Sequence, residues 1–141
     1  MISAVDTSIL SAVLSDQPGT QVADSLLTEA RDRGGVVICG IVYSELFAHP
    51  LMTGEIIEDF LQRTGLEVDY RLDKTVWKEA GIRFKKYAER RRRARQEWPR
   101  RLLADFVIGA HSLLHADRLI TFNGADFRRD FPELLIAPEL A

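Results

Sequence analysis

The sequence has few of the features that mark disulfide-rich, membrane-spanning or multidomain proteins. It has one cysteine, Cys39, so no intrachain disulfide can form and a reducing, cytoplasmic environment is expected. No apolar run approaches bilayer-spanning length, and the first residues lack the basic and apolar segments of a secretory signal. No repeat or Pro/Gly/Ser-rich linker divides the 141 residues, of which 46% are hydrophobic. The chain is therefore expected to form a single domain over residues 1–141.

Short runs of β-prone residues alternate with helix-length segments. The expected strands cover residues 2–5, 36–39, 66–68, 119–121 and 134–136. Buried parallel strands read as continuous apolar runs, and helices between successive strands favour right-handed crossovers. The pattern therefore predicts an α/β fold with a central, mostly parallel sheet of about five strands.

The intervening segments predict helices at about residues 9–14, 20–33, 41–48 and 53–63, and Thr7 or Ser8 is expected to cap the first. Asp73 is expected to cap a long helix that runs into the arginines, and another helix is expected from Pro99 to about His115. The long helix has an apolar stripe that is expected to face the core and contains Trp77, Phe84 and Tyr87. A polar loop is expected after Thr121.

The charge of the chain is unevenly distributed. The net charge is −2, but residues 83–101 contain ten basic residues and two acids, a net charge of +8. The rest of the chain has nine basic and nineteen acidic residues, a net charge of −10. A basic segment on an otherwise acidic protein can attract phosphate backbones without indiscriminate binding.

Acidic residues occur where burial favours apolar ones. Asp6 ends the first hydrophobic run, Glu45 lies beside an apolar helix stripe, and Asp105 interrupts an almost wholly apolar segment. A carboxylate held beside a core needs a cation or a proton. We expect these acids to converge at the carboxyl ends of the strands, where α/β proteins form their sites. Simpler alternatives are helix capping by Asp6, a role that Thr7 or Ser8 can also fill, and a helix-dipole role for Asp105.

Two neighbouring patterns bear on this site. Gly109 and Ser112 follow Asp105 at i+4 and i+7, a narrow stripe expected to face a metal-filled cleft rather than the core. After the last residue of a predicted strand, Thr121, come Asn123 and Asp126, which can point into the same cleft. Asn-Gly is also an ordinary turn signal, and the turn is the expectation unless the other acids converge here.

Oxygen ligands without a cysteine or histidine framework favour Mg²⁺ or Mn²⁺ over zinc. His111 and His115 have the i, i+4 spacing of a zinc pair, but the segment lacks the accompanying ligands, so packed or surface histidines are expected. Divalent ions activate water and neutralise phosphate oxygens. An acid cluster together with a basic segment therefore indicates a nuclease.

The acidic and strand-end motifs resemble a known family. Val-Asp6-Thr-Ser, Glu45, Leu-Ala-Asp105-Phe-Val-Ile-Gly-Ala-His and Leu-Ile-Thr121-Phe-Asn123 are similar to the motifs of PIN domains, and specifically of VapC toxins. The resemblance spans nearly the whole chain, and it rests on the order and spacing of motifs that are individually weak. It implies a three-layer α/β/α fold.

The resemblance also implies a function. It implies a Mg²⁺- or Mn²⁺-dependent endoribonuclease toxin that is neutralised by a cognate VapB-type antitoxin, is a homodimer and leaves 5′-phosphate and 3′-hydroxyl ends. Asp6, Glu45 and Asp105 would bind the metal, with Ser8 and Thr121 lining the site. Many relatives have an acid where this chain has Asn123, so Asn123 or Asp126 is expected to fill the fourth catalytic position.

The basic segment has three interpretations. It can bind single-stranded or structured RNA with Trp98 as a stacking platform, dock an acidic antitoxin segment, or form a solvated helix end. RNA binding is preferred, although consecutive arginines point all around a helix and cannot all contact one ligand. The residues concerned are Arg90, Arg91, Arg92, Arg93, Arg95, Arg100 and Arg101.

Other functions fit the sequence less well. Aspartyl-phosphate phosphotransferases have Asp-x-Asp after the first strand, and this chain has Asp6-Thr7-Ser8. Receiver modules need paired early acids and a late lysine, whereas the last lysine here is Lys86. A catalytically silent PIN-like module that binds RNA or protein is the remaining alternative, and Asn123 favours it.

Overall fold

The computed structural model describes residues 1–15, 18–95 and 101–139, and its centre is a sheet of five parallel strands. The strands are β1 (Ser3–Val5), β2 (Val36–Cys39), β3 (Glu67–Asp69), β4 (Arg118–Ile120) and β5 (Leu135–Ala137). Their order in the sheet is β3-β2-β1-β4-β5. In the central strand, Ala4 pairs with Val37 on one side and with Leu119 on the other. The predicted strands are confirmed to within one residue at each end.

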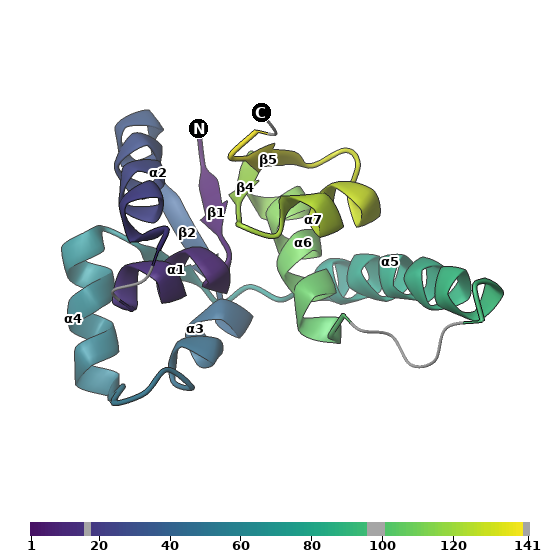
Figure 1. Cartoon of the computed structure of the whole chain (residues 1–141), viewed down its shortest axis with the longest axis horizontal. Coiled ribbons are helices and arrows are strands. Elements are labelled where there is room, and N and C mark those ends of the chain that lie inside the picture. Colours follow the sequence, from purple (N-terminus) through teal and green to yellow (C-terminus); the bar gives the residue numbers. More distant parts are fainter. Residues whose placement is uncertain (16–17, 96–100, 140–141) are drawn as a thin grey trace.

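Helices cover both faces of this sheet, so the predicted three-layer α/β/α arrangement is confirmed. The helices are α1 (Thr7–Leu14), α2 (Thr20–Arg33), α3 (Gly40–Leu46), α4 (Gly54–Thr64), α5 (Lys74–Arg93), α6 (Leu103–His115) and α7 (Gly124–Asp130). In Figure 1, α1 to α4 gather on the left and α5 to α7 on the right, with the C-terminal half of α5 projecting from the body. No helix of the described residues is long and apolar enough to cross a membrane.

Side-chain caps fix the starts of three helices. Thr53 accepts a hydrogen bond from the backbone N–H of Ile56, and Asp73 accepts one from that of Val76, as N-caps do. The N-cap of α1 is Asp6, whose carboxylate accepts from the backbone N–H of Thr7. The prediction that Thr7 or Ser8 caps this helix is therefore wrong, and Asp6 combines capping with its position at a strand end.

The segment after β4 is a helix, not the expected polar loop. Asn123 occupies the N-cap position of α7, and the backbone N–H of Phe127 donates to its carbonyl. Phe127 and Phe131 then bury their rings in the core. The Asn-Gly turn signal therefore marks the start of a short helix that tertiary packing stabilises.

Two predictions about helix faces are wrong. Trp77 is 47% exposed, whereas Phe84 and Tyr87 do pack against the buried ring of Phe106, at centroid distances of 5.2 and 5.5 Å. Gly109 faces the core, because a Cβ there would lie 2.3 Å from the Phe131 ring.

The other residue of the Gly109 stripe is also part of the core. Ser112 is fully buried and its hydroxyl donates to the carbonyl of Ile108, at 2.7 Å. The stripe of small residues therefore permits close packing instead of facing a metal-filled cleft.

The strand order places a topological switch beside β1. The chain proceeds from β1 outward to β2 and β3, then crosses back through α5 and α6 to β4 on the other side. Sites in open α/β sheets form at the carboxyl ends of strands beside such a switch. Asp6, which follows β1, occupies this place.

Candidate active site

Asp6 is the centre of a hydrogen-bonded group at the carboxyl end of β1. The residue is only 4% exposed. Its Oδ1 accepts from the backbone N–H of Thr7, and its Oδ2 accepts from the hydroxyls of Ser8 at 2.9 Å and Thr121 at 2.7 Å. Three donors from β1–α1 and from the end of β4 therefore fix one buried carboxylate, which supports the placing of Ser8 and Thr121 beside Asp6.

Glu45 reaches the same place from α3. The hydroxyl of Thr7 donates to Glu45 Oε1 at 2.8 Å, while the backbone N–H of Thr7 donates to Asp6. Thr7 therefore links two carboxylates that lie 39 positions apart in the sequence. The sequence marks Thr7 only as a candidate helix cap, and no pattern in it shows that the hydroxyl bridges to α3.

Asp105 is the third acid and lies in the first turn of α6. Its carboxylate is partly exposed, and Oδ2 lies 3.7 Å from Nε of Arg101, one turn earlier along the chain. A negative charge in the first helical turn also interacts favourably with the helix dipole. The dipole role proposed for Asp105 and a role in the acid site are therefore compatible.

Electrostatics show that the three acids share one region. Burial raises the pKa of Glu45, and the negative charges of Asp6 and Asp105 raise it further against the hydrogen bond from Thr7. Burial likewise raises the pKa of Asp105, and Asp6 and Asp126 add to that shift while Arg101 opposes it. Asp6, Glu45 and Asp105 therefore lie close enough for their charges to interact, and these three residues are called here the acid site.

The residues after Thr121 lie at the edge of the acid site. Asn123 is exposed, and its backbone N–H donates to Thr121 Oγ1 at 3.0 Å. Asp126 pairs with Arg129 at 2.9 Å, and its charge raises the pKa of Asp105. Asp126 therefore adds negative charge to the acid site from α7, whereas Asn123 contributes a hydrogen bond that supports Thr121.

The basic segment is partly neutralised by acids from other elements. Asp130, whose side chain is 1% exposed, forms ion pairs with Arg90 and with Arg101. Arg83 pairs with Glu133 at 2.8 Å and with Glu79 on its own helix. Several cations of this segment therefore connect α5 and the residues before α6 to α7 and the loop beyond it. The sequence does not show this role, because the partner acids follow far along the chain.

The remaining arginines of the segment differ in exposure. Arg92, Arg93 and Arg95 are exposed at the end of α5, and Arg91 lines a pocket beside it. Arg100 and Trp98 lie outside the described residues.

The two histidines of α6 each lie beside an aspartate. His111 is buried, and its Nε2 hydrogen-bonds Asp69 Oδ2 at 2.9 Å. Burial lowers the pKa of His111. His115 Nε2 lies 3.6 Å from Asp73 Oδ2. Packed histidines are confirmed.

The donors of the acid site suit a hard divalent cation. Within residues 1–15, 18–95 and 101–139, no three His, Cys, Asp or Glu side chains already have the arrangement of a metal cage. Nevertheless, three carboxylates supply the oxygen ligands that Mg²⁺ and Mn²⁺ prefer, and the pKa values of Glu45 and Asp105 are raised by burial and, to a smaller extent, by neighbouring negative charges. A cation would relieve that repulsion, so the residues fit such an ion.

Comparison with known proteins gives a match over most of the chain. The family model described as "PIN domain" matches residues 4–130. No curated protein sequence matches the chain.

Several solved structures are similar in fold. VapBC-1 from nontypeable Haemophilus influenzae matches with a TM-score of 0.63 and 23% identity, covering 96% of each chain. VapBC2 from Rickettsia felis, bound to a promoter DNA fragment, matches with a TM-score of 0.65 and 19% identity over 96% of this chain and 97% of that one. FitAcB from Neisseria gonorrhoeae matches with a TM-score of 0.60 and 19% identity over 96% of each.

Proposed function

We propose that this chain, which belongs to the PIN domain family, is a Mg²⁺- or Mn²⁺-dependent endoribonuclease that cleaves phosphodiester bonds in cellular RNA. One observation carries the proposal. Thr7 hydrogen-bonds both Asp6 and Glu45 at the carboxyl end of β1, and the charge of Asp6 adds to the burial that raises the pKa of Asp105. An uncompensated acid cluster at this position is suited to cation-assisted hydrolysis.

In this proposal Asp6, Glu45 and Asp105 hold the cation. A bound Mg²⁺ or Mn²⁺ supplies Lewis acidity at the scissile phosphate and a lowered pKa for attacking water. Thr7, Ser8 and Thr121 act as positioning residues, because their hydrogen bonds hold the carboxylates of Asp6 and Glu45.

The fourth catalytic position falls to the edge of the acid site. Asp126 adds a charge that acts on Asp105, and we propose that it orients water there. Asn123 is the other candidate for this position, since its amide can accept or donate a hydrogen bond without adding charge.

The proposal includes a protein partner. Similar folds occur in VapBC and FitAcB complexes, which supports a toxin role and a cognate VapB-type antitoxin for this chain. A homodimer and a cytoplasmic location remain predictions that accompany this role. A catalytically silent PIN-like module is the second candidate, and the amide of Asn123, in place of an acid, favours it.

Cleavage of RNA by the purified protein, freed of its partner, tests the proposal. We expect single-stranded RNA to be cut with Mg²⁺ or Mn²⁺ and EDTA to stop the reaction. Asp6→Asn and Asp105→Asn should each reduce cleavage by at least about 100-fold, because each removes a charged ligand. The ends should be 5′-phosphate and 3′-hydroxyl.

A matched control is Asp59→Asn, which removes an exposed carboxylate paired with Arg63 on α4 and should leave cleavage unchanged. Full activity in both Asp6→Asn and Asp105→Asn would assign the cleavage to a contaminant. A folded protein that binds RNA but cuts none with either ion would establish the silent module instead.

A further inference from the structure

Arg101 places a buried positive charge beside the acid site. Its side chain is 8% exposed, and its Nε lies 3.7 Å from Asp105 Oδ2, which is longer than a hydrogen bond. Burial raises the pKa of Asp105, and the charge of Arg101 opposes that shift. Arg101 therefore acts on one of the carboxylates to which we assign the cation.

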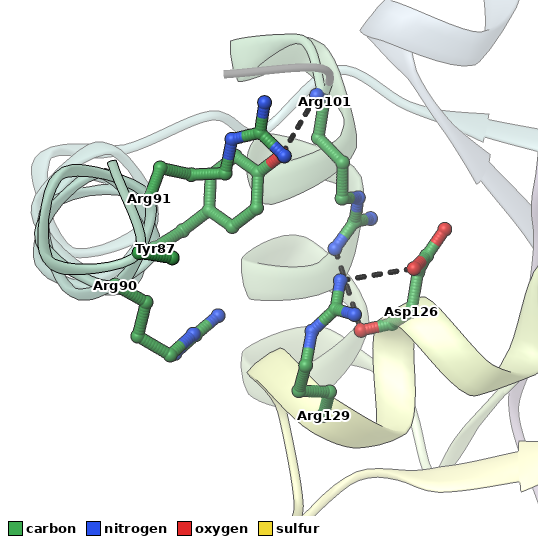
Figure 2. Close-up of a pocket in the computed structure, with 7 residues that line it drawn as sticks. Tyr87, Arg90, Arg91, Arg101, Asp126 and Arg129 are labelled. Atoms are coloured by element: carbon green, nitrogen blue, oxygen red, sulfur yellow. Dashed lines mark hydrogen bonds and ion pairs between the residues drawn. The ribbon is translucent and has the colours of Figure 1, made fainter. Parts of the chain in front are cut away.

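The helix α7 holds the other side of the Arg101 guanidinium. Figure 2 shows the side chain running from the start of α6 toward the helix that carries Asp126. Its Nη1 donates to the backbone carbonyl of Asp126 at 3.4 Å and forms an ion pair with Asp130 Oδ2. Among the described residues, Asp105 and Asp130 are the two carboxylates within ion-pair distance of Arg101, and the closer pair is with Asp130.

Aromatic rings fix the position of Arg101 but do not neutralise its charge. The guanidinium lies over the rings of Phe106 and Phe127, at 4.8 Å from each centroid. The backbone N–H donates to the hydroxyl of Tyr87 at 3.2 Å (Figure 2). A buried cation also needs an acid. Asp130, whose side chain is 1% exposed, supplies it from α7.

A guanidinium and a metal ion compete for a carboxylate. Both bind the same oxygens, and their positive charges repel each other. In a partly buried site these charges interact more strongly than they would in water. Neutralisation of Arg101 by Asp130 therefore favours cation binding at Asp105.

We propose that Asp130 is a positioning residue of the acid site that acts through Arg101. By binding the guanidinium from the side of α7, Asp130 keeps Arg101 from occupying Asp105 and leaves that carboxylate to the metal ion. The inference rests on the proposed function and adds to it a residue that lies outside the acid site. The role of Asp130 in joining α7 to α5 does not by itself predict an effect on metal affinity.

Isothermal titration of the metal-free protein with Mn²⁺ tests this assignment. Asp130→Asn should weaken Mn²⁺ binding by about tenfold, because Arg101 keeps its charge and has only Asp105 left to pair with among the described residues. Arg101→Gln should instead tighten Mn²⁺ binding by about threefold, because it removes the competing charge. A purely structural role predicts weaker binding in both variants, since each breaks the same ion pair.

The double variant completes a mutant cycle. When Arg101→Gln is already present, Asp130→Asn should change the Mn²⁺ affinity by less than about twofold, because no guanidinium remains for Asp130 to withhold. The double variant is expected to fold, because two neutral amides replace the ion pair and no unpaired Arg101 is left behind.

Two further variants serve as controls. Glu133→Gln removes the partner of Arg83, another arginine that lies over a core ring, at 5.0 Å from the centroid of Phe131. Its Mn²⁺ affinity should stay within about twofold of the wild type. Asp6→Asn should abolish the binding heat, which assigns that heat to the acid site.

RNA cleavage gives a second measurement. Asp130→Asn should need about ten times more Mn²⁺ for half-maximal cleavage. Its kcat at saturating Mn²⁺ should lie within about threefold of the wild type, because excess metal displaces the guanidinium from Asp105.

Two results would overturn the assignment while leaving the proposed function intact. One is weaker Mn²⁺ binding by Arg101→Gln, and the other is an equal effect of Asp130→Asn with and without Arg101. Circular dichroism establishes which variants fold, and if Asp130→Asn does not, the affinity of Arg101→Gln relative to the wild type decides. Failure of the proposed function differs from these results, because the wild type itself would then bind no Mn²⁺ at the acid site or cut no RNA.

Discussion

Asp105 and Asp130 are both aspartates beside the core, but their surroundings are opposite. Asp130 is almost fully buried, and arginines from α5 and the start of α6 neutralise it. Asp105 is partly exposed, and burial together with the charges of Asp6 and Asp126 raises its pKa against a single arginine at 3.7 Å. Arginines of the chain therefore neutralise the charge of Asp130, whereas the three carboxylates of the acid site have only Arg101 as a neighbouring cation among the pairs described above. This difference separates an acid that holds the fold together from the acids to which we assign cation binding.

The largest effect on stability is expected from a substitution of Asp130. Asp130→Asn keeps the shape of the side chain but leaves the charge of Arg101 buried without its main partner. Removal of one member of a buried ion pair costs about 3–5 kcal/mol, and we expect a loss of that size in the free energy of unfolding. Urea denaturation followed by circular dichroism would measure it.

Asp126→Asn is the matched control for that variant. Asp126 lies on the same helix and pairs with Arg129, which also lies 3.7 Å from Asp130, but Asp126 and Arg129 are both about half exposed. An exposed pair contributes about 0–1 kcal/mol, so this variant should remain close to wild type. Equal stability of the two variants would contradict the structural role assigned to Asp130.

The acid site should instead respond to pH and to the cation concentration. Glu45 and Asp105 have raised pKa values, so they take up protons at a higher pH than ordinary carboxyl groups do. Protons and the cation compete for the same oxygens. We expect kcat/KM for RNA cleavage to fall by about tenfold or more per pH unit below these pKa values, beginning above the ordinary carboxyl range of about 4.

A tenfold increase in Mn²⁺ should shift this fall to lower pH, because the bound cation opposes protonation. The pH profile measured at two Mn²⁺ concentrations tests the competition. A profile that does not move with the Mn²⁺ concentration would show that the titrating groups are not ligands.

The sheet and the position of Asp6 at a buried strand end could be predicted from the sequence, for a common physical reason. Buried parallel strands require unbroken apolar runs, so each strand is visible locally, and an acid directly after such a run stands out. Asp6 was identified in this way. Asp105 was identified because it interrupts a helix that is otherwise apolar. The expectation that the two converge used the rule that sites form at the carboxyl ends of parallel strands, which places Asp6 directly but not Asp105, since Asp105 lies in the first turn of α6.

Long-range partners could not be predicted in the same way. Asp130 follows two arginines and looks like part of a charged surface helix, while its main partners lie 29 and 40 positions earlier. Thr7 looks like an ordinary cap, and its contact with Glu45 depends on how α3 packs. The helix α7 was missed because Asn-Gly favours a turn and only burial of Phe127 and Phe131 stabilises so short a helix.

The smallest predicted effect is a gain in stability at the acid site. In the metal-free protein the pKa of Glu45 is raised above its value in the unfolded chain, so its ionised form destabilises the fold as pH rises through the folded pKa. Glu45→Gln removes that charge and can still accept the hydrogen bond from Thr7. We expect its Tm to exceed that of the wild type by about 3 °C at pH 7.

Solution conditions should cancel or reverse the gain from Glu45→Gln. It should vanish below about pH 4, where Glu45 is protonated in both states. Saturating Mn²⁺ should reverse it, because only the wild type retains all three carboxylate ligands and ligand binding stabilises the folded state. Glu67→Gln, an exposed change on β3, is the control and should stay within about 0.5 kcal/mol of wild type in every condition. If Glu45→Gln lowers Tm at pH 7 without metal, Glu45 is a structural acid like Asp130, and the contrast between the two sites fails at that residue.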